Sequence, residues 1–172
     1  FTGAITNQAG STLEVGDGAT FEADSITNDD GGTINVGFGS TLSGTGNTIN
    51  NSGVMNVADT GTVQDAGAIN NLDTGVYNFN GNGTMTVDTD GVGGEAISNA
   101  GDMNFNGGAG TTVNINSGSG TANLTNSGTF DVAVDSTVSS ADTLNIDNTT
   151  GAITVSAGGT LNVNDLDTSG AT

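Results

Sequence analysis

The chain has 172 residues and carries 19 acidic residues with no Lys, Arg or His, so its formal charge is −19 at pH 7. Because no cation is present to neutralise phosphates, we expect no nucleic-acid partner and no polybasic membrane patch. His general bases, Schiff-base lysines and zinc sites built on His or Cys are also excluded, since Cys is absent too. No run of about 18 apolar residues occurs, so we expect no direct membrane insertion.

Hydrophobic residues make up 33% of the chain and aromatic residues 4%, while Gly alone contributes 30 residues. Such a composition is compatible with a disordered chain, and it does not predict a thick globular core. The absence of Pro and a regular repeat of apolar pairs argue instead for an ordered fold.

One phrase recurs along the chain: an aliphatic residue, a polar residue, Asn, a short Gly-containing turn, and an apolar–polar–apolar segment. Its copies open at Ile5, Ile26, Ile49, Ile69, Ile97, Leu124 and Ile146, spaced by 21, 23, 20, 28, 27 and 22 residues. The apolar–polar–apolar segments open at Leu13, Ile34, Met55, Tyr77, Met103, Phe130 and Ile153. A third apolar site follows at Phe21, Leu42, Val63, Met85 with Val87, Val113 with Ile115, Val138, and Leu161 with Val163.

This two-residue alternation is the strand signature, and helical spacing is not sustained anywhere in the chain. Three short strands per copy predict an all-β fold, a right-handed parallel β-helix (β-solenoid) of about seven coils of 20–28 residues. We expect one domain, 1–172, with longer coils at 69–96 and 97–123. The extra residues around Thr86–Glu95 and Gly107–Ala122 are expected in loops, as length variation or as the place where binding concentrates.

The same Asn closes the first segment of every copy: Asn7, Asn28, Asn51, Asn71, Asn99, Asn126 and Asn148. Asn is common in this chain and suits tight turns, which is one explanation of its recurrence. The explanation we favour is a ladder of stacked amides along a corner of the solenoid, as in cross-β stacks. Either role is structural, and we expect no catalytic residues and no enzyme.

Two phrases, 49–57 (INNSGVMNV) and 124–132 (LTNSGTFDV), carry a family resemblance, and 156–163 (SAGGTLNV) adds a second typical phrase. With them the chain resembles the β-helical passenger regions of bacterial autotransporters and related large adhesins over residues 5 to 163. The resemblance implies export, a secreted or cell-surface location, and a structural or adhesive role. The chain departs from that family in having no basic residue and no membrane-barrel translocator within its sequence.

We therefore expect an extracellular structural rod, either assembling head-to-tail into a filament or forming part of an adhesin stalk. Its partner is then another copy of itself or the remainder of a larger adhesin. The assembly ends are expected at Ile5, Leu13 and Val15 in the first coil and at Leu161 and Val163 in the last, because end coils expose strand edges. A head-to-tail contact of this kind makes open fibres.

No cofactor is required, and Ca²⁺ is the alternative worth testing, as part of an adhesin segment that contacts a host or surface ligand. Asp88 and Asp90 are spaced by two before a Gly, as an oxygen-donor loop requires. The pairs Asp29 with Asp30 and Asp165 with Asp167 are weaker candidates for metal ligands. Solvated turn residues are the competing explanation, since Asp also suits turns.

The sequence leaves two further functions and one modification open. A polysaccharide-acting β-helix enzyme needs two carboxylates at a suitable distance, but the chain has no Trp and one Tyr to stack on a sugar. Ice binding calls for regular rows of Thr-x-Thr; Thr84-Met85-Thr86 has this form, but the varying coil lengths do not favour such rows. Asn123-Leu124-Thr125 and Asn148-Thr149-Thr150 fit the N-glycosylation pattern, which is a weak signal.

Overall fold

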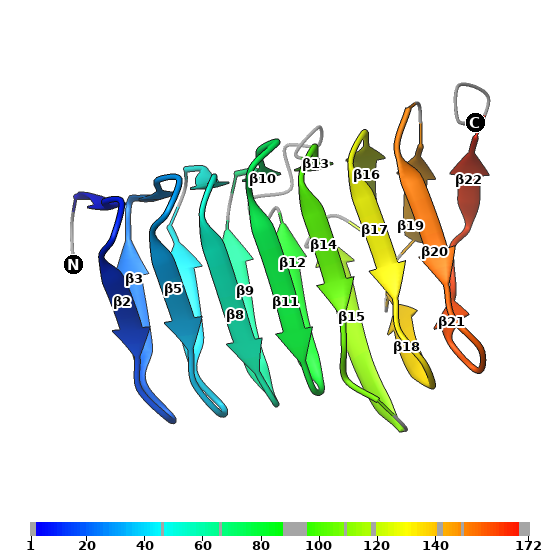
Figure 1. Cartoon of the computed structure of the whole chain (residues 1–172), viewed down its shortest axis with the longest axis horizontal. Coiled ribbons are helices and arrows are strands. Elements are labelled where there is room, and N and C mark those ends of the chain that lie inside the picture. The colour runs from blue at the N-terminus through cyan, green and yellow to red at the C-terminus, as the bar shows by residue number, and fades with distance from the viewer. Residues whose placement is uncertain are drawn as a thin grey trace.

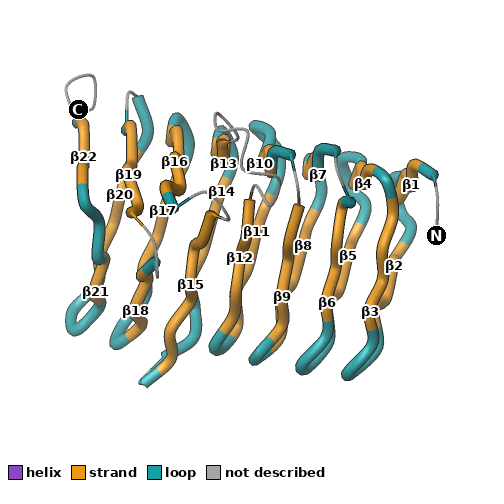
Figure 2. The backbone as a smooth tube through the Cα atoms, turned by 180° about the vertical axis from the view of Figure 1, so that it is seen from behind, coloured by secondary structure: helices purple, strands orange, loops and turns teal. Residues whose placement is uncertain are grey.

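The chain winds as a right-handed β-solenoid of about seven coils, and the computed structural model contains strands but no helix among the residues it describes. Those residues are 3–45, 47–65, 67–87, 96–108, 110–117, 120–140, 143–148 and 150–168. In Figure 1 the chain advances from left to right while the front strands run downward and the strands behind them run upward, which defines the right-handed winding. Figure 2 shows the same stack of coils from behind. The predicted fold is confirmed.

Three parallel sheets line the faces of the coil; the first seven coils contribute one strand to each sheet, and β22 adds an eighth strand to sheet A. Sheet A consists of β1 (Ala4–Asn7), β4 (Ser25–Asn28), β7 (Ile49–Asn51), β10 (Ile69–Asn71), β13 (Ala96–Asn99), β16 (Thr121–Asn126), β19 (Thr143–Asp147) and β22 (Asp165–Asp167). Sheet B consists of β2 (Thr12–Val15), β5 (Thr33–Val36), β8 (Val54–Ala58), β11 (Val76–Asn80), β14 (Asp102–Phe105), β17 (Thr129–Val132) and β20 (Ala152–Val155). Sheet C consists of β3 (Thr20–Ala23), β6 (Thr41–Gly44), β9 (Gly61–Asp65), β12 (Gly83–Val87), β15 (Thr111–Ser117), β18 (Ser136–Ser139) and β21 (Thr160–Leu161).

The pairing register follows the sequence repeat. Ile26 lies beside Ile49 in sheet A, and Ile69 lies beside Ile97 although this step spans the longest coil. In sheet B, Tyr77 lies beside Met103. A slip of one residue would turn these side chains outward, so burying one face of each strand fixes the register.

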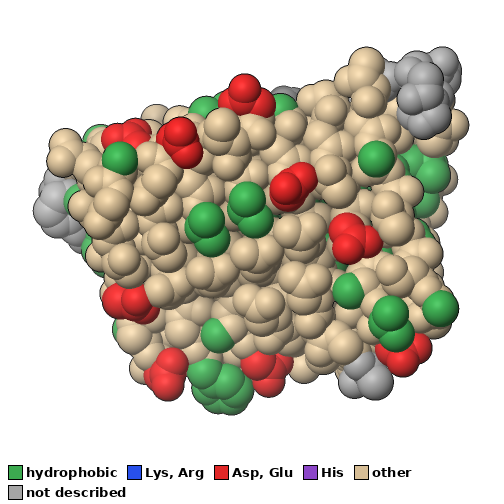
Figure 3. Space-filling model, in the orientation of Figure 1, with side chains coloured by type: hydrophobic (Ala, Val, Ile, Leu, Met, Phe, Trp, Pro, Cys, Tyr) green, Lys and Arg blue, Asp and Glu red, His purple; other side chains and the backbone are tan. Residues whose placement is uncertain are grey.

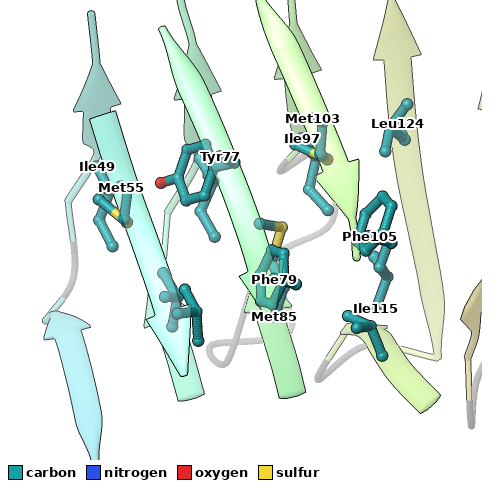
Figure 4. Close-up of a cluster of buried hydrophobic side chains, with 14 of the residues drawn as sticks. Ile49, Met55, Tyr77, Phe79, Met85, Ile97, Met103, Phe105, Ile115 and Leu124 are labelled. Carbon is teal, nitrogen blue, oxygen red and sulfur yellow. The ribbon is translucent and has the colours of Figure 1, made fainter. Parts of the chain in front are cut away.

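The core is a column of apolar side chains that point inward from all three sheets. In Figure 4, side chains from facing sheets, such as Ile49 with Met55 and Phe79 with Met85, meet in the interior. All four have no exposed surface. A single coil could not bury these groups alone, so each coil depends on its neighbours for its core.

The middle coils hold the bulkiest core. The Phe79 and Phe105 rings stack with centroids 5.4 Å apart and an interplanar angle of 13°, and Phe105 and Phe130 approach to 4.9 Å at 47°. Tyr77 and Phe79, two residues apart on β11, have centroids 6.4 Å apart. Four of the seven aromatic residues are thus fully buried in three successive coils.

In sheet C the third apolar site does not form one straight row. Leu42, Val63 and Met85 share a row that continues to Ile115. Val113 lies beside Gly83, and its row continues through Val138 to Leu161. The fifth coil therefore places Val113 in a row that Gly83 and Gly61 occupy in the two preceding coils, and the later coils keep apolar residues in that row.

The two expected insertions have different outcomes. Residues 88–95 of the first lie outside the described residues. The second, expected in a loop over Gly107–Ala122, is largely strand, because β15 covers Thr111–Ser117 and β16 begins at Thr121. Val113, Ile115 and Ala122 in this segment are buried. The expectation of a loop was wrong for this part, because its alternating apolar residues extend sheets C and A.

Candidate functional site

All seven repeated Asn side chains form one continuous ladder in the interior, at the corner between sheets A and B. In each step the Nδ2 of one Asn donates to the Oδ1 of the Asn in the next coil toward the C-terminus. The six distances from Asn7 to Asn148 are 2.8, 2.8, 3.0, 2.8, 2.7 and 2.7 Å. The side chains are 7% exposed at Asn7, 3% at Asn148, and 0–1% in between. The predicted ladder is confirmed.

Each ladder amide also holds the backbone of the corner. Asn71 Nδ2 donates to Gly75 O in its own coil at 3.1 Å and to Asp102 O in the next coil at 3.0 Å. Asn28 makes the same pair of bonds, to Gly32 O at 3.3 Å and Val54 O at 3.1 Å. Gly75 O also accepts from the Asp102 N–H, and Gly32 O from the Val54 N–H, so the amides add side-chain bonds to a corner whose backbone is already paired.

A second ladder, of glycines, lies against the amides and was not predicted from the sequence. A Cβ atom at Gly53 would stand 2.7 Å from Asn28 Nδ2, and at Gly151 2.5 Å from Asn126 Nδ2. Backbone carbonyls crowd the same positions, so no side chain fits there. The Gly that follows each ladder Asn from the second coil onward is Gly32, Gly53, Gly75, Gly101, Gly128 and Gly151.

Sheet B carries a further row of amides on its outer face, with the opposite polarity. Asn56 donates to Asn35 Oδ1 at 2.9 Å, Asn78 to Asn56 at 3.0 Å and Asn104 to Asn78 at 3.0 Å. Asn35 in turn donates to Glu14 Oε1 at 2.5 Å, so the Glu14 carboxylate accepts the hydrogen bond from the last amide of the row. The sequence signal for this row was the Asn between the two apolar residues of four successive copies.

The corner between sheets B and C is fastened by acidic and amide side chains. Asp17 Oδ1 accepts from the Phe38 backbone N–H at 3.0 Å, and Asp59 Oδ1 accepts from Asn82 N–H at 2.8 Å. Asn82 Oδ1 accepts from Thr112 N–H at 2.9 Å. Each bond joins one coil to the next, so these carboxylates act as turn residues that satisfy backbone donors.

Among the described residues, the two candidate pairs of calcium ligands lie far apart. Asp29 and Asp30 form the corner after β4, while Asp165 and Asp167 lie on β22, six strands further along sheet A and therefore about 29 Å away. Asp88 and Asp90 lie outside the described residues. Within the described part of the chain, no group of three or more acidic side chains is placed to share a metal ion. Calcium binding at Asp88 and Asp90 stays a prediction.

Acidic side chains are scattered over the face seen in Figure 3, with uncharged surface between them. On the outer face of sheet A, Asp147 and Asp167 occupy directly opposed positions on β19 and β22. Both are exposed. Like charges in opposed positions of neighbouring strands are destabilising, so this pair weakens the pairing of β22 with β19.

The two glycosylation patterns differ in access. Asn123 is exposed on β16, so its side chain is accessible. Asn148 is 3% exposed and accepts the last hydrogen bond of the ladder, so an enzyme could not reach its amide in the folded chain. Asn123 therefore remains a candidate acceptor, and Asn148 does not.

The expected assembly ends lie at the two ends of the coil stack. Ile5 and Leu13 are partly buried against the core at the N-terminal end, where Val15 is 3% exposed. Leu161 and Val163 are partly buried at the C-terminal end. Interior coils bury the equivalent positions fully, so both ends present apolar surface that a further coil would cover.

No protein-family model matches the chain, and no curated protein or solved structure is significantly similar to it. The resemblance to adhesin passenger regions therefore rests on the sequence phrases, and the fold rests on the structure. No helix in the described part of the chain is long and apolar enough to cross a membrane.

Proposed function

We propose that the chain is a structural rod of an extracellular surface fibre, joined end to end with further coils of the same kind. The observation that carries this proposal is the uninterrupted ladder from Asn7 to Asn148, which links every coil to the next through buried hydrogen bonds. The hydrogen bonds between coils run along the rod, so pulling on the ends loads many bonds at once. A rod of seven coils spans roughly 34 Å at the ordinary strand spacing.

The chemistry of the chain also supports a structural role. The geometry that repeats from coil to coil lies in the interior, where Asn and Gly hold the corners. The chain has no His, Cys, Lys or Arg to act as a nucleophile or base. Its acidic groups at the corner between sheets B and C bind backbone N–H groups. The absence of Lys and Arg also removes every trypsin cleavage site, which suits a fibre outside the cell.

The location is tested by labelling intact producing cells with an antibody against the folded chain, followed by electron microscopy. We expect label along fibres outside the cell. Label confined to the interior of permeabilised cells would contradict the proposal. The calcium alternative is tested by repeating the imaging after chelation, which we expect to leave the fibres unchanged.

A further inference from the structure

The two ends of the coil stack do not fit together directly. Sheet A has eight strands, whereas sheets B and C have seven, because β22 begins an eighth coil beside β19. If a second copy extended sheets B and C without a gap, its β2 would pair with β20 and its β3 with β21. Its β1 would then need the place beside β19 that β22 occupies. Stacking β1 on β22 instead would leave sheets B and C one strand short.

The sequence of β1 fits the place beside β19 better than β22 does. In the register of β19 and β22, Leu166 lies beside Ile146 and Asp167 beside Asp147. In the same register β1 would place Ile5 beside Ile146, a pair that matches the Ile5–Ile26 pair within the chain. Leu166 is 42% exposed in its present position, so β22 buries little of its one apolar side chain.

The exchange would also change the charges on sheet A. β22 places the Asp167 carboxylate in the position opposed to Asp147. β1 would place Thr6 there, and a hydroxyl can donate to a carboxylate. Two opposed like charges would be replaced by a polar pair, which removes a destabilising interaction.

The ladder supplies the third argument. At the ladder position of the eighth coil, β22 is followed by Thr168, whereas β1 ends with Asn7. Among the described residues, Asn148 Nδ2 donates to Gly151 O in its own coil at 3.0 Å and to no Asn beyond it. Asn7 Oδ1 is the acceptor end of the ladder, so an Asn148–Asn7 bond continues its polarity. If the N-terminal ends of two copies met instead, the Oδ1 atoms of their two Asn7 residues would face each other, and both are acceptors.

We infer that a second copy of this chain joins the C-terminal end by strand exchange, in which its β1 displaces β22 from β19. The inference rests on the proposed end-to-end assembly and specifies its register. β22 then acts as a removable cover for the end of sheet A. In the joined state, Leu13 of the incoming copy covers Ile153, and Asn7 extends the ladder by one step.

Cysteine cross-linking of the full chain tests the register, since the chain has no native Cys. Thr6→Cys with Asp147→Cys reports the exchange, and Thr6→Cys with Asp167→Cys reports stacking on β22. Strands in register are about 4.8 Å apart, which permits a disulfide. The reaction is run in about 1 M NaCl, where the Debye length of about 3 Å screens repulsion between copies. We expect disulfide-linked oligomers from the first pair and not from the second.

A lock on β22 provides the functional test. Asp147→Cys with Asp167→Cys joins β19 to β22 when oxidised, and we expect it to abolish elongation until a reductant is added. The matched control, Thr125→Cys with Asp147→Cys, joins β16 to β19 in the same outer row and leaves β22 able to move. We expect the control to elongate whether it is oxidised or reduced.

Three results would overturn the exchange: oligomers from the Thr6 and Asp167 pair, elongation of the locked variant equal to that of the control, or no association of copies at all. The first two leave end-to-end assembly standing with a different register. The third result would contradict self-assembly itself. Surface labelling of cells would still decide separately whether the rod belongs to an extracellular fibre.

Discussion

Asn71 donates from Nδ2 to Asn99 Oδ1 at 2.8 Å, although the two residues are 28 positions apart in the chain. This is the longest step of the ladder, yet its hydrogen bond is as short as the step from Asn7 to Asn28. The extra residues of the fourth coil therefore leave the corner geometry unchanged. The corner, and not the length of the coil, sets the stacking.

Replacing a central ladder amide is expected to be costly. Asn71→Ala removes bonds to Asn99, Asp102 and Gly75 and leaves buried partners unsatisfied, so we expect a loss of about 2–5 kcal/mol in the free energy of unfolding. Asn71→Asp, with a similar shape but no donor when ionised, should also destabilise. Chemical denaturation measures both, with Asn70→Ala on the outer face as the control, for which we expect less than about 1 kcal/mol.

The glycine ladder predicts a second contrast. Gly53→Ala would push a Cβ atom against Asn28 Nδ2 at 2.7 Å and against backbone carbonyls that cannot move aside, so we expect a loss of about 2–4 kcal/mol. Gly16→Ala meets no atom within 4 Å and should change stability by less than about 1 kcal/mol. Equal thermal unfolding temperatures for the two variants would argue against the close approach of Gly53 to the ladder.

The aromatic stack predicts where the core is most sensitive. Phe105→Ala removes a fully buried ring that contacts Phe79 and Phe130, so we expect a loss of about 3–5 kcal/mol. Phe38→Ala removes a ring that is 56% exposed in a corner and should cost less than about 1 kcal/mol. Urea unfolding followed by circular dichroism provides the comparison, and similar midpoints would contradict the packing described here.

Salt is expected to stabilise the rod. The chain has 19 acidic residues and no basic side chain, so added salt screens repulsion and weakens no attractive ion pair between side chains. The unfolding temperature should rise between about 10 mM and 1 M NaCl. At matched ionic strength, CaCl₂ should give the same rise if cations act by screening. A much larger rise with CaCl₂, reversed by a chelator, would favour specific sites such as Asp88 and Asp90.

The fold and the Asn ladder could be predicted from sequence because one residue type recurs at one place in each copy, and that place maps onto one corner. The glycine ladder is not predictable from the sequence, because Gly is abundant and its spacing from the ladder Asn varies, from two residues at Gly53 to four at Gly75. The direction of the hydrogen bonds and the place of β22 depend on three-dimensional stacking. No sequence pattern reports either.

The expected loop over Gly107–Ala122 shows a different limit. The length of this copy predicts an insertion, but Val113 and Ile115 alternate as a strand does and are buried in sheet C. The alternation of apolar residues predicts the strand here and the coil length does not, because the burial of one face determines where a strand forms.

Hydrogen exchange of Asn side-chain amides, followed by nuclear magnetic resonance, tests the ladder most directly. We expect seven side-chain NH₂ groups to exchange far more slowly than those of exposed residues such as Asn80 and Asn123, with Asn7 and Asn148 the fastest of the seven. If all Asn side chains exchanged at the rate of exposed amides, the buried ladder, and with it the stacked coil proposed as a rod, would be contradicted.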